Sequence, residues 1–150
     1  MTAAMLFSGT TAFAADTDDM DVTLTVAADC EVTATAMDFG NLTAGGLSGA
    51  TATSTISVNC ATGISYQVSL DAGDGASATT TARKMTHTTV SSNTVDYGIF
   101  TDSGHTANFA TATAATGTGS AVDTTAYGQI SSTTAAAGDY TDTITVSLVY

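Results

Sequence analysis

Basic residues are almost absent from this chain. Its 150 residues include only two that are Lys or Arg, namely Arg83 and Lys84, against 14 Asp and Glu, so the formal net charge is -12 at pH 7. Two cations cannot neutralise a run of phosphates or hold an anionic membrane surface, and no apolar run approaches the roughly 20 residues that a membrane helix needs. We therefore expect no nucleic-acid partner and no membrane insertion.

Proline and tryptophan are also absent, and large apolar side chains are few. Leu, Ile, Val and Phe together number 26, whereas Thr and Ala account for 60 of the 150 positions. A chain of this length is expected to hold one domain, and its hydrophobic core must be thin. Apolar residues nowhere recur at helical spacing over ten or more positions, so the sequence disfavours α-helices.

Alternation of apolar and polar residues indicates β-strands instead. The clearest case is Tyr140 to Tyr150, in which Ile144, Val146, Leu148 and Tyr150 share one face. Similar runs are Ile56 to Cys60, Ile64 to Leu70, Tyr97 to Phe100 and Ala126 to Ile130. About six or seven such strands, separated by glycine-containing turns, predict an all-β fold that is a sandwich of two antiparallel sheets.

Cysteine is scarce, with only Cys30 and Cys60 in the chain. Neither has a Cys or His neighbour at metal-ligand spacing, so no zinc site is predicted. A bridge between the two would close a loop of about 31 residues, for which chain entropy gives roughly 3.7 kcal/mol of stabilisation. On the residues alone, two unpaired buried thiols are the alternative.

Residues suited to catalysis are few. His87 and His105 are the only imidazoles and lie in polar, turn-like sequence. With so many Ser, Thr and Asp in the chain, a triad drawn around either of them carries no weight. The acidic segment Asp16 to Asp21 lacks the glycine and the bidentate Glu of an EF-hand loop, so we interpret it as a hydrated tail. The sequence predicts no catalytic residue, no metal and no cofactor, and we expect the chain not to be an enzyme.

Residues 1–14 have the features of a truncated signal peptide. The stretch Met1 to Phe13 is uncharged and mostly small or apolar, and Ala12-Phe13-Ala14 fits the small-x-small rule for cleavage before Ala15. No basic residue precedes the apolar stretch, and a floppy N-terminus on a cytosolic protein is the alternative. We expect an exported mature chain that begins near Ala15.

The two ends of the mature chain are complementary. The last alternating strand stops at the final residue, so no further strand is expected to cover its apolar edge, and such an edge is a template for another chain. Near the start, Met20, Val22, Leu24 and Val26 form a spare alternating run, joined to Cys30 by three residues. Burial of these four side chains as a donor strand is worth on the order of 6 to 12 kcal/mol. From periodicity alone, the run could equally pair with its own sandwich.

Several motifs, taken in order, carry a resemblance to a known family. They are Val26 to Cys30, Met37-Asp38-Phe39-Gly40, Ile56 to Cys60, Tyr66 to Gly73, Tyr127 to Ile130 and Ala137 to Val146. In their order and spacing, from about residue 20 to Tyr150, the chain resembles the spore coat protein U domain family. That family includes the subunits of archaic chaperone-usher pili, of which the Csu type is one.

The resemblance implies an incomplete immunoglobulin-like sandwich that a donor strand from a neighbouring subunit completes. It divides the mature chain into a donor segment, residues 15–29, and a pilin domain, residues 30–150, and it implies a disulfide between Cys30 and Cys60. The implied donor residues are Met20, Val22, Leu24 and Val26. The implied acceptor groove includes Phe39, Ile56, Val58, Ile144, Val146 and Leu148.

The function implied by the resemblance is that of a structural pilus subunit. A periplasmic chaperone would lend a strand to the groove, and an outer-membrane usher would exchange it for the N-terminal segment of the next identical or related subunit. A head-to-tail filament would then grow on the cell surface. The family also serves in spore coats, so a spore-coat structural protein is an alternative. A monomeric secreted binding module and an exported hydrolase are further hypotheses, but the chain has no Trp for carbohydrate stacking and no hydrolase motif.

Overall fold

The structure, a computed structural model of the chain, describes residues 16–27, 29–112 and 114–150. These residues form nine β-strands and one short 3₁₀ turn, which confirms the all-β prediction. The elements are β1 (Cys30–Ala34), η1 (Ala44–Gly46), β2 (Thr51–Cys60), β3 (Ser65–Leu70), β4 (Arg83–His87), β5 (Thr94–Phe100), β6 (Ala115–Thr116), β7 (Ala121–Ile130), β8 (Tyr140–Thr141) and β9 (Val146–Val149). Among the described residues, no helix is long and apolar enough to cross a membrane.

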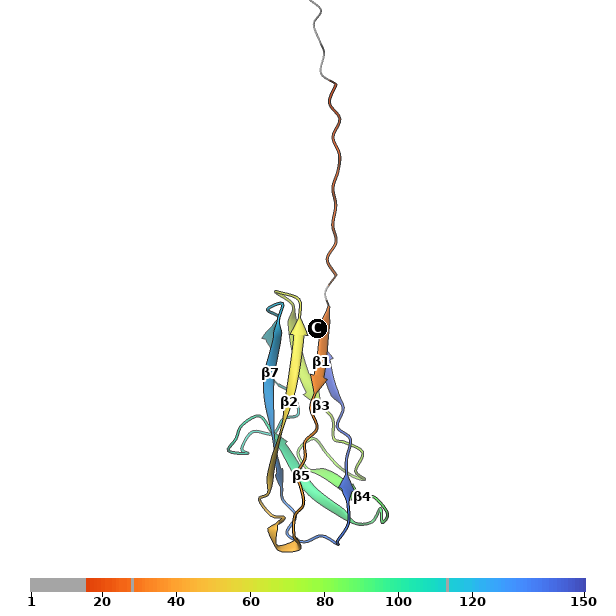
Figure 1. Cartoon of the computed structure of the whole chain (residues 1–150), viewed down its shortest axis with the longest axis vertical. Helices are drawn as coiled ribbons and strands as arrows, with labels where there is room; N and C mark the ends of the chain where they lie inside the picture. Colours follow the sequence, from red (N-terminus) through yellow and green to blue (C-terminus); the bar gives the residue numbers. More distant parts are fainter. Residues whose placement is uncertain (1–15, 28, 113) are drawn as a thin grey trace, which may run out of the picture.

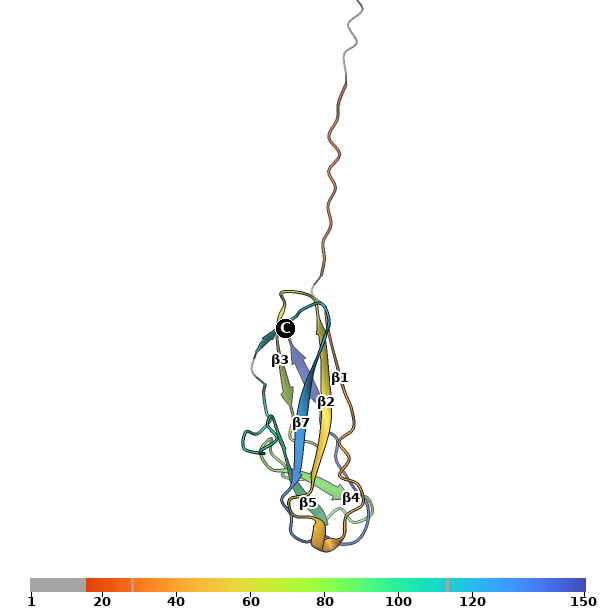
Figure 2. The same ribbon diagram turned by 60° about the vertical axis from the view of Figure 1, so that its left-hand side comes forward.

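Two antiparallel sheets make the sandwich. The larger sheet has the strand order β1-β2-β7-β5-β4-β8, and the smaller has the order β6-β3-β9. The long strands β2 and β7 pair along nine positions and lie side by side over much of the length of the molecule (Figures 1 and 2). The N-terminal segment leaves the sandwich at the pole where β1 begins, and the C-terminus lies at the same pole, whereas η1 lies at the opposite one (Figure 1).

The core lies between the sheets and follows from the strand alternation. In β3, Tyr66, Val68 and Leu70 are buried while Ser65 and Gln67 are exposed, as the sequence pattern predicts. The other main core residues point inward from their own strands, apart from Phe109, which lies in a loop. They are Ile56, Val58, Val95, Ile99, Phe109 and Ile130.

The final strand differs from its prediction. The run from Tyr140 to Tyr150 is split into β8, which pairs with β4 in the larger sheet, and β9, which pairs with β3 in the smaller one. Residues 142–145 therefore cross from one sheet to the other. The predicted alternation persists through the crossover, since Ile144 is half-buried and Thr143 and Thr145 are exposed. Alternation determines which face a residue occupies, but it carries no information about which sheet pairs with it.

Other strands were under-predicted. The sequence indicates six or seven strands and the described residues contain nine. The sequence did not predict β4, because this strand begins with the only two cations of the chain and ends at His87. Such a polar stretch is more typical of a turn. Strand β7 starts at Ala121, five residues before the predicted run, because pairing with β2 extends a polar stretch into a strand.

Candidate functional site

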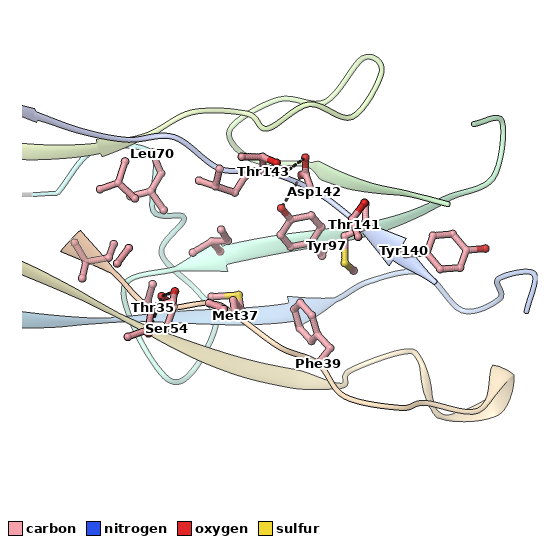
Figure 3. Close-up of a pocket in the computed structure, with 18 residues that line it drawn as sticks. Thr35, Met37, Phe39, Ser54, Leu70, Tyr97, Tyr140, Thr141, Asp142 and Thr143 are labelled. Carbon is pink, nitrogen blue, oxygen red and sulfur yellow. Dashed lines mark hydrogen bonds between the residues drawn. The ribbon is translucent and has the colours of Figure 1, made fainter. Parts of the chain in front are cut away.

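An elongated apolar cavity of about 450 Å³, here called the groove, runs along the sandwich (Figure 3). One wall is made by Ala34 at the end of β1 and by residues 35–37 and Phe39 beyond it, and the other by residues 140–144 and Val146. The floor is made by inward side chains of the two sheets, among them Ile56, Leu70 and Ile99. A second hollow of about 630 Å³ adjoins the groove and shares Met37, Phe39, Met85 and Tyr140 with it.

Both walls of the groove belong to sheet edges. Strand β1 is the outermost strand of the larger sheet at one side and β8 at the other, and β9 is outermost in the smaller sheet. An edge strand presents a row of backbone N–H and C=O groups without a ladder partner. The Thr145 carbonyl accepts from the Asp71 amide. In an extended strand, successive residues direct their backbone N–H and C=O groups to opposite sides, so those of Ile144 and Val146 point away from Asp71. The groove can therefore offer hydrogen bonds as well as apolar surface.

The first wall continues the line of β1 beyond its last residue. The Thr35 amide donates to the Thr55 carbonyl at 3.0 Å, and the Thr55 amide donates to the Thr35 hydroxyl at 2.9 Å. Further on, Met37 and Phe39 pack over Gly128 of β7, where an added Cβ would collide with both side chains. Glycine at this position makes room for the wall to approach the sheet closely.

In the second wall, the carboxylate of Asp142 faces the phenol of Tyr97, which is on β5 (Figure 3). The Tyr97 hydroxyl donates to Asp142 Oδ2 at 2.7 Å, and Asp142 Oδ1 accepts from the amides of Asp74 at 2.7 Å and Thr143 at 2.9 Å. Burial, and then the hydrogen bond to Asp142, raise the pKa of the Tyr97 phenol far above its usual value. Tyr97 is therefore a neutral donor at any physiological pH.

A second carboxylate, Asp71, supports the same wall. Its Oδ1 accepts from the amides of Thr145 and Gly73, both at 3.0 Å. Partial burial raises the pKa of Asp71, but the two amide hydrogen bonds and the charge of Arg83 outweigh it and leave the pKa below its usual value.

Arg83 lies behind this wall and is fully buried. Its guanidinium donates to the carbonyls of Asp71 at 3.0 Å, Thr80 at 2.7 Å and Phe109 at 3.1 Å, and reaches that of Leu70 at 3.4 Å. Burial lowers the pKa of Arg83, and the nearby Tyr97 and Asp71 oppose that shift. Arg83 thus ties three segments together at the base of the wall.

Sequence reasoning assigned no role to Arg83, Tyr97, Asp71 or Asp142. One signal for Asp142 was available, because it has the same parity as the apolar residues Ile144 and Val146 and so places a carboxylate on a face that is otherwise apolar. Arg83 gave no such signal, since its carbonyl partners come from segments up to 26 residues away in the chain.

Four of the six predicted acceptor residues line the groove, namely Phe39, Ile56, Ile144 and Val146. The other two lie elsewhere. Val58 is buried in the core, and Leu148 is half-buried and packs against it.

The predicted donor residues lie outside the sandwich. The side chains of Met20, Val22, Leu24 and Val26 are 87, 87, 86 and 78% exposed, and residues 16–27 form no strand. The segment extends away from the pole at which β1 begins (Figure 2). Such a row of exposed large apolar side chains at alternate positions is unusual for a soluble domain and indicates an interaction segment.

The two cysteines anchor this segment. Cys30, the first residue of β1, lies directly opposite Cys60, the last residue of β2, and the two form a disulfide. The bridge joins the start of an edge strand to the strand beside it.

No metal-binding arrangement is present in the described part of the chain, where no three His, Cys, Asp or Glu residues cluster at ligand distance. His87 has a local structural role, because its Nδ1 accepts from the amides of Thr89 and Val90 and its ring packs edge-on against Tyr140. His105 packs edge-on against Phe100 and Tyr127.

The two antiparallel sheets form a sandwich of the immunoglobulin-like type, with a groove between sheet edges. The family model for the Spore Coat Protein U domain matches residues 16–147, and the chain belongs to that family. A search of curated proteins found no match.

Among solved structures, the chain is similar to one from the CsuC-CsuE chaperone-tip adhesion subunit pre-assembly complex of the archaic chaperone-usher Csu pili of Acinetobacter baumannii. The TM-score is 0.63 and the sequence identity 22%. The match covers 84% of this chain and 40% of the solved one, so this chain spans less than half the length of the solved chain. At this level of identity the likeness demonstrates a shared fold.

Proposed function

We propose that this chain is a structural subunit of a surface pilus of the chaperone-usher type, and that its copies join by donor-strand exchange. In this proposal the segment that carries Met20, Val22, Leu24 and Val26 completes the groove of a neighbouring copy. The observation that carries the proposal is that one chain holds both an exposed alternating segment and an apolar groove between two sheet edges.

Strand directions support a head-to-tail arrangement. Strand β9 runs toward the pole at which the N-terminal segment leaves, and every strand pair in the described sheets is antiparallel. A donor strand antiparallel to β9 would therefore leave the groove at the η1 pole, where its own sandwich would begin. Because the two contacting poles differ, the contact repeats without closing and builds a fibre.

The energetic gain is large relative to the stability of a small domain. Burial of four apolar side chains contributes on the order of 6 to 12 kcal/mol. Backbone hydrogen bonds to the edges that flank the groove add to this gain, and the ordering of the donor segment opposes it. Only three residues, 27–29, separate Val26 from Cys30, so consecutive sandwiches would lie close together.

The open groove also implies temporary partners. An apolar groove between unpaired edges promotes aggregation, so a periplasmic chaperone that fills it and an outer-membrane usher that exchanges the filler are the partners we propose. The disulfide supports passage through an oxidising compartment such as the periplasm, and the expected location is a filament outside the cell. The proposed signal peptide, residues 1–14, lies outside the described residues.

A spore-coat structural protein is the second candidate, because the family description names that role. It would use the same groove and the same N-terminal segment in a coat instead of a filament. Negative-stain microscopy of the surface of the source cells separates the two, when mass spectrometry identifies this chain in the fibres or in the coat.

The proposal is tested by charge substitution on the two faces of the donor segment. Leu24→Asp places a carboxylate on the apolar face, and Thr25→Asp places one on the opposite face of the same segment. Leu24 is 86% exposed and Thr25 is exposed as well, so neither substitution disturbs the sandwich itself. We expect the wild type and Thr25→Asp to form ladders that survive mild detergent, and Leu24→Asp to remain monomeric.

Ladders of equal length from Leu24→Asp would contradict strand exchange. So would a wild-type chain that stays monomeric, with its own segment in its own groove, both with and without a chaperone.

A further inference from the structure

The crossover at residues 142–145 is held without a strand ladder. It lies between β8 and β9, and its backbone contacts go to the loop that follows β3. The Asp71 amide donates to the Thr145 carbonyl at 3.1 Å, and Asp71 Oδ1 accepts from the Thr145 amide at 3.0 Å. The side chain of Asp71 thus stands in for a backbone carbonyl at the point where β3 has ended.

Asp142 performs the same task at the other end of the crossover. Its Oδ1 accepts from the amides of Thr143 and Asp74, and its Oδ2 accepts from the Tyr97 hydroxyl. Gly73 allows the loop to come this close, because its φ is +80° and an added Cβ would collide with the Asp142 carboxylate. The two carboxylates therefore fix both ends of the crossover to one loop.

The bonds from Asp71 and Asp74 approach the crossover from the loop side, whereas the bond from the Tyr97 hydroxyl comes from β5 and reaches only the side chain of Asp142. A neighbouring strand on the groove side would use the backbone groups of Ile144 and Val146, whereas the carboxylates leave those groups available. Asp142 also lines the groove itself. The arrangement keeps one wall of the groove in an extended conformation while its pairing edge stays open.

We propose that Asp142 and Asp71 are positioning residues for the donor strand, which hold the crossover in register to receive it; this inference rests on the proposed function. Loss of the Asp142 carboxylate would release Thr143 and Asp74 and free the wall to move. The groove would then bind the donor segment more weakly, and this loss of affinity would exceed that caused by removing a carboxylate with similar hydrogen bonds elsewhere in the fold.

The test measures binding of a fluorescent synthetic peptide of residues 16–27 to the full mature chain, by anisotropy at low chain concentration. We expect Asp142→Ala to weaken binding by at least about tenfold and Tyr97→Phe by about fivefold. Asp142→Asn retains an oxygen that accepts from Asp74 and Thr143, and we expect it to stay within about twofold of wild type.

The matched control is Asp102→Ala. The Asp102 carboxylate also accepts from two backbone amides, those of Thr106 and Ala107, and from the Thr106 hydroxyl, but it lies in a different loop and does not line the groove. We expect its peptide affinity to stay within about twofold of wild type.

Unchanged affinity in Asp142→Ala, or an equal loss in Asp142→Ala and Asp102→Ala, would overturn the positioning role. Should Asp142→Ala not fold, unchanged affinity in Tyr97→Phe, which retains the ring, overturns it instead. If the wild-type chain binds the peptide no better than a peptide with Leu24→Asp, the proposed function itself fails, and the positioning role with it.

Discussion

At the scale of single residues, the two neighbouring cations have opposite environments. Strand alternation turns Arg83 into the molecule, where its donors meet backbone carbonyls, and turns Lys84 outward to an ion pair with Asp96 on the neighbouring strand. A buried polar group is costly only when its partners are missing. The described residues contain no buried side-chain nitrogen or oxygen without a hydrogen-bond partner, so the carbonyl contacts of Arg83 offset part of the cost of burying its charge.

Replacement of the buried cation should be far more damaging than replacement of its exposed neighbour. Arg83→Met removes the buried hydrogen bonds to the Leu70 and Phe109 carbonyls and the partly buried ones to Asp71 and Thr80, and we expect it to lower the free energy of unfolding by about 3 kcal/mol. Lys84→Met removes a partly exposed ion pair, and we expect a loss under about 1 kcal/mol. Urea titrations of both variants provide the measurement, and equal losses would mean that the carbonyl contacts of Arg83 do not stabilise the fold.

The acid sensitivity of the fold should depend in part on Asp71. Its pKa is lower in the folded chain than the ordinary 3.8. Its contribution to stability is therefore present above about pH 4 and is lost as the pH falls through the lower, folded value. In melting curves from about pH 6 to pH 2, we expect Asp71→Asn to have a shallower acid limb than wild type. Part of the acid dependence should persist in this variant, because the hydrogen bond from the Ala107 amide also lowers the pKa of Asp102. Parallel curves would show that Asp71 does not contribute.

At the scale of elements, β1 depends on its covalent bond to β2. β1 is a short edge strand, and three of its five residues are exposed. The disulfide at its first residue spans a sequence separation of 30 residues. The bridge restricts the unfolded chain and fixes the start of the strand that continues into the groove wall.

Removal of the bridge should therefore lower stability without changing the fold class. For a loop of this length, the chain-entropy estimate for the double variant Cys30→Ala and Cys60→Ala is a loss of about 3.7 kcal/mol. Denaturant unfolding of the variant and of the reduced wild type should give similar midpoints. A midpoint equal to that of the oxidised wild type would refute the estimate.

Much of the fold could be predicted at this scale, but the pairing could not. Period-two alternation identified β3 and the apolar face of the C-terminal run, because each residue reports its own exposure. It missed the division of that run, since residues 142–145 are held by Asp71 and Asp142 and not by a ladder. Donor and groove residues were assigned from the alternating ends and a family resemblance. The polar support of the groove wall was missed because its partners come together only in the folded chain.

At the scale of the whole molecule, like charges should oppose association. Residues 16–27 carry four of the 14 acidic side chains, while residues 30–150 carry nine together with both basic ones. In the proposed exchange, two copies would therefore repel one another as the N-terminal segment of one approaches the groove of the other. Salt shortens the range of this repulsion to within about 10 Å at 0.1 M.

Association of the donor segment should consequently speed up with ionic strength. We expect the rate constant for binding of the 16–27 peptide to rise several-fold between about 20 mM and 500 mM salt at pH 7. A peptide with its four Asp residues replaced by Asn should show a much weaker dependence. Stopped-flow fluorescence gives both rates, and a rate that falls with salt would argue against repulsion as the controlling barrier.

The position of the disulfide has a mechanical consequence. In a fibre joined by N-terminal segments, tension on one copy would enter its sandwich at residue 30, the first residue of β1. Because β1 is an edge strand, hydrogen bonds alone would hold it weakly against such a load. Cys30 is covalently bonded to Cys60, so the load would pass at its point of entry into β2, which is paired on both sides. Pulling would then shear β2 against its neighbours along its length, a geometry that resists rupture better than unzipping one pair at a time.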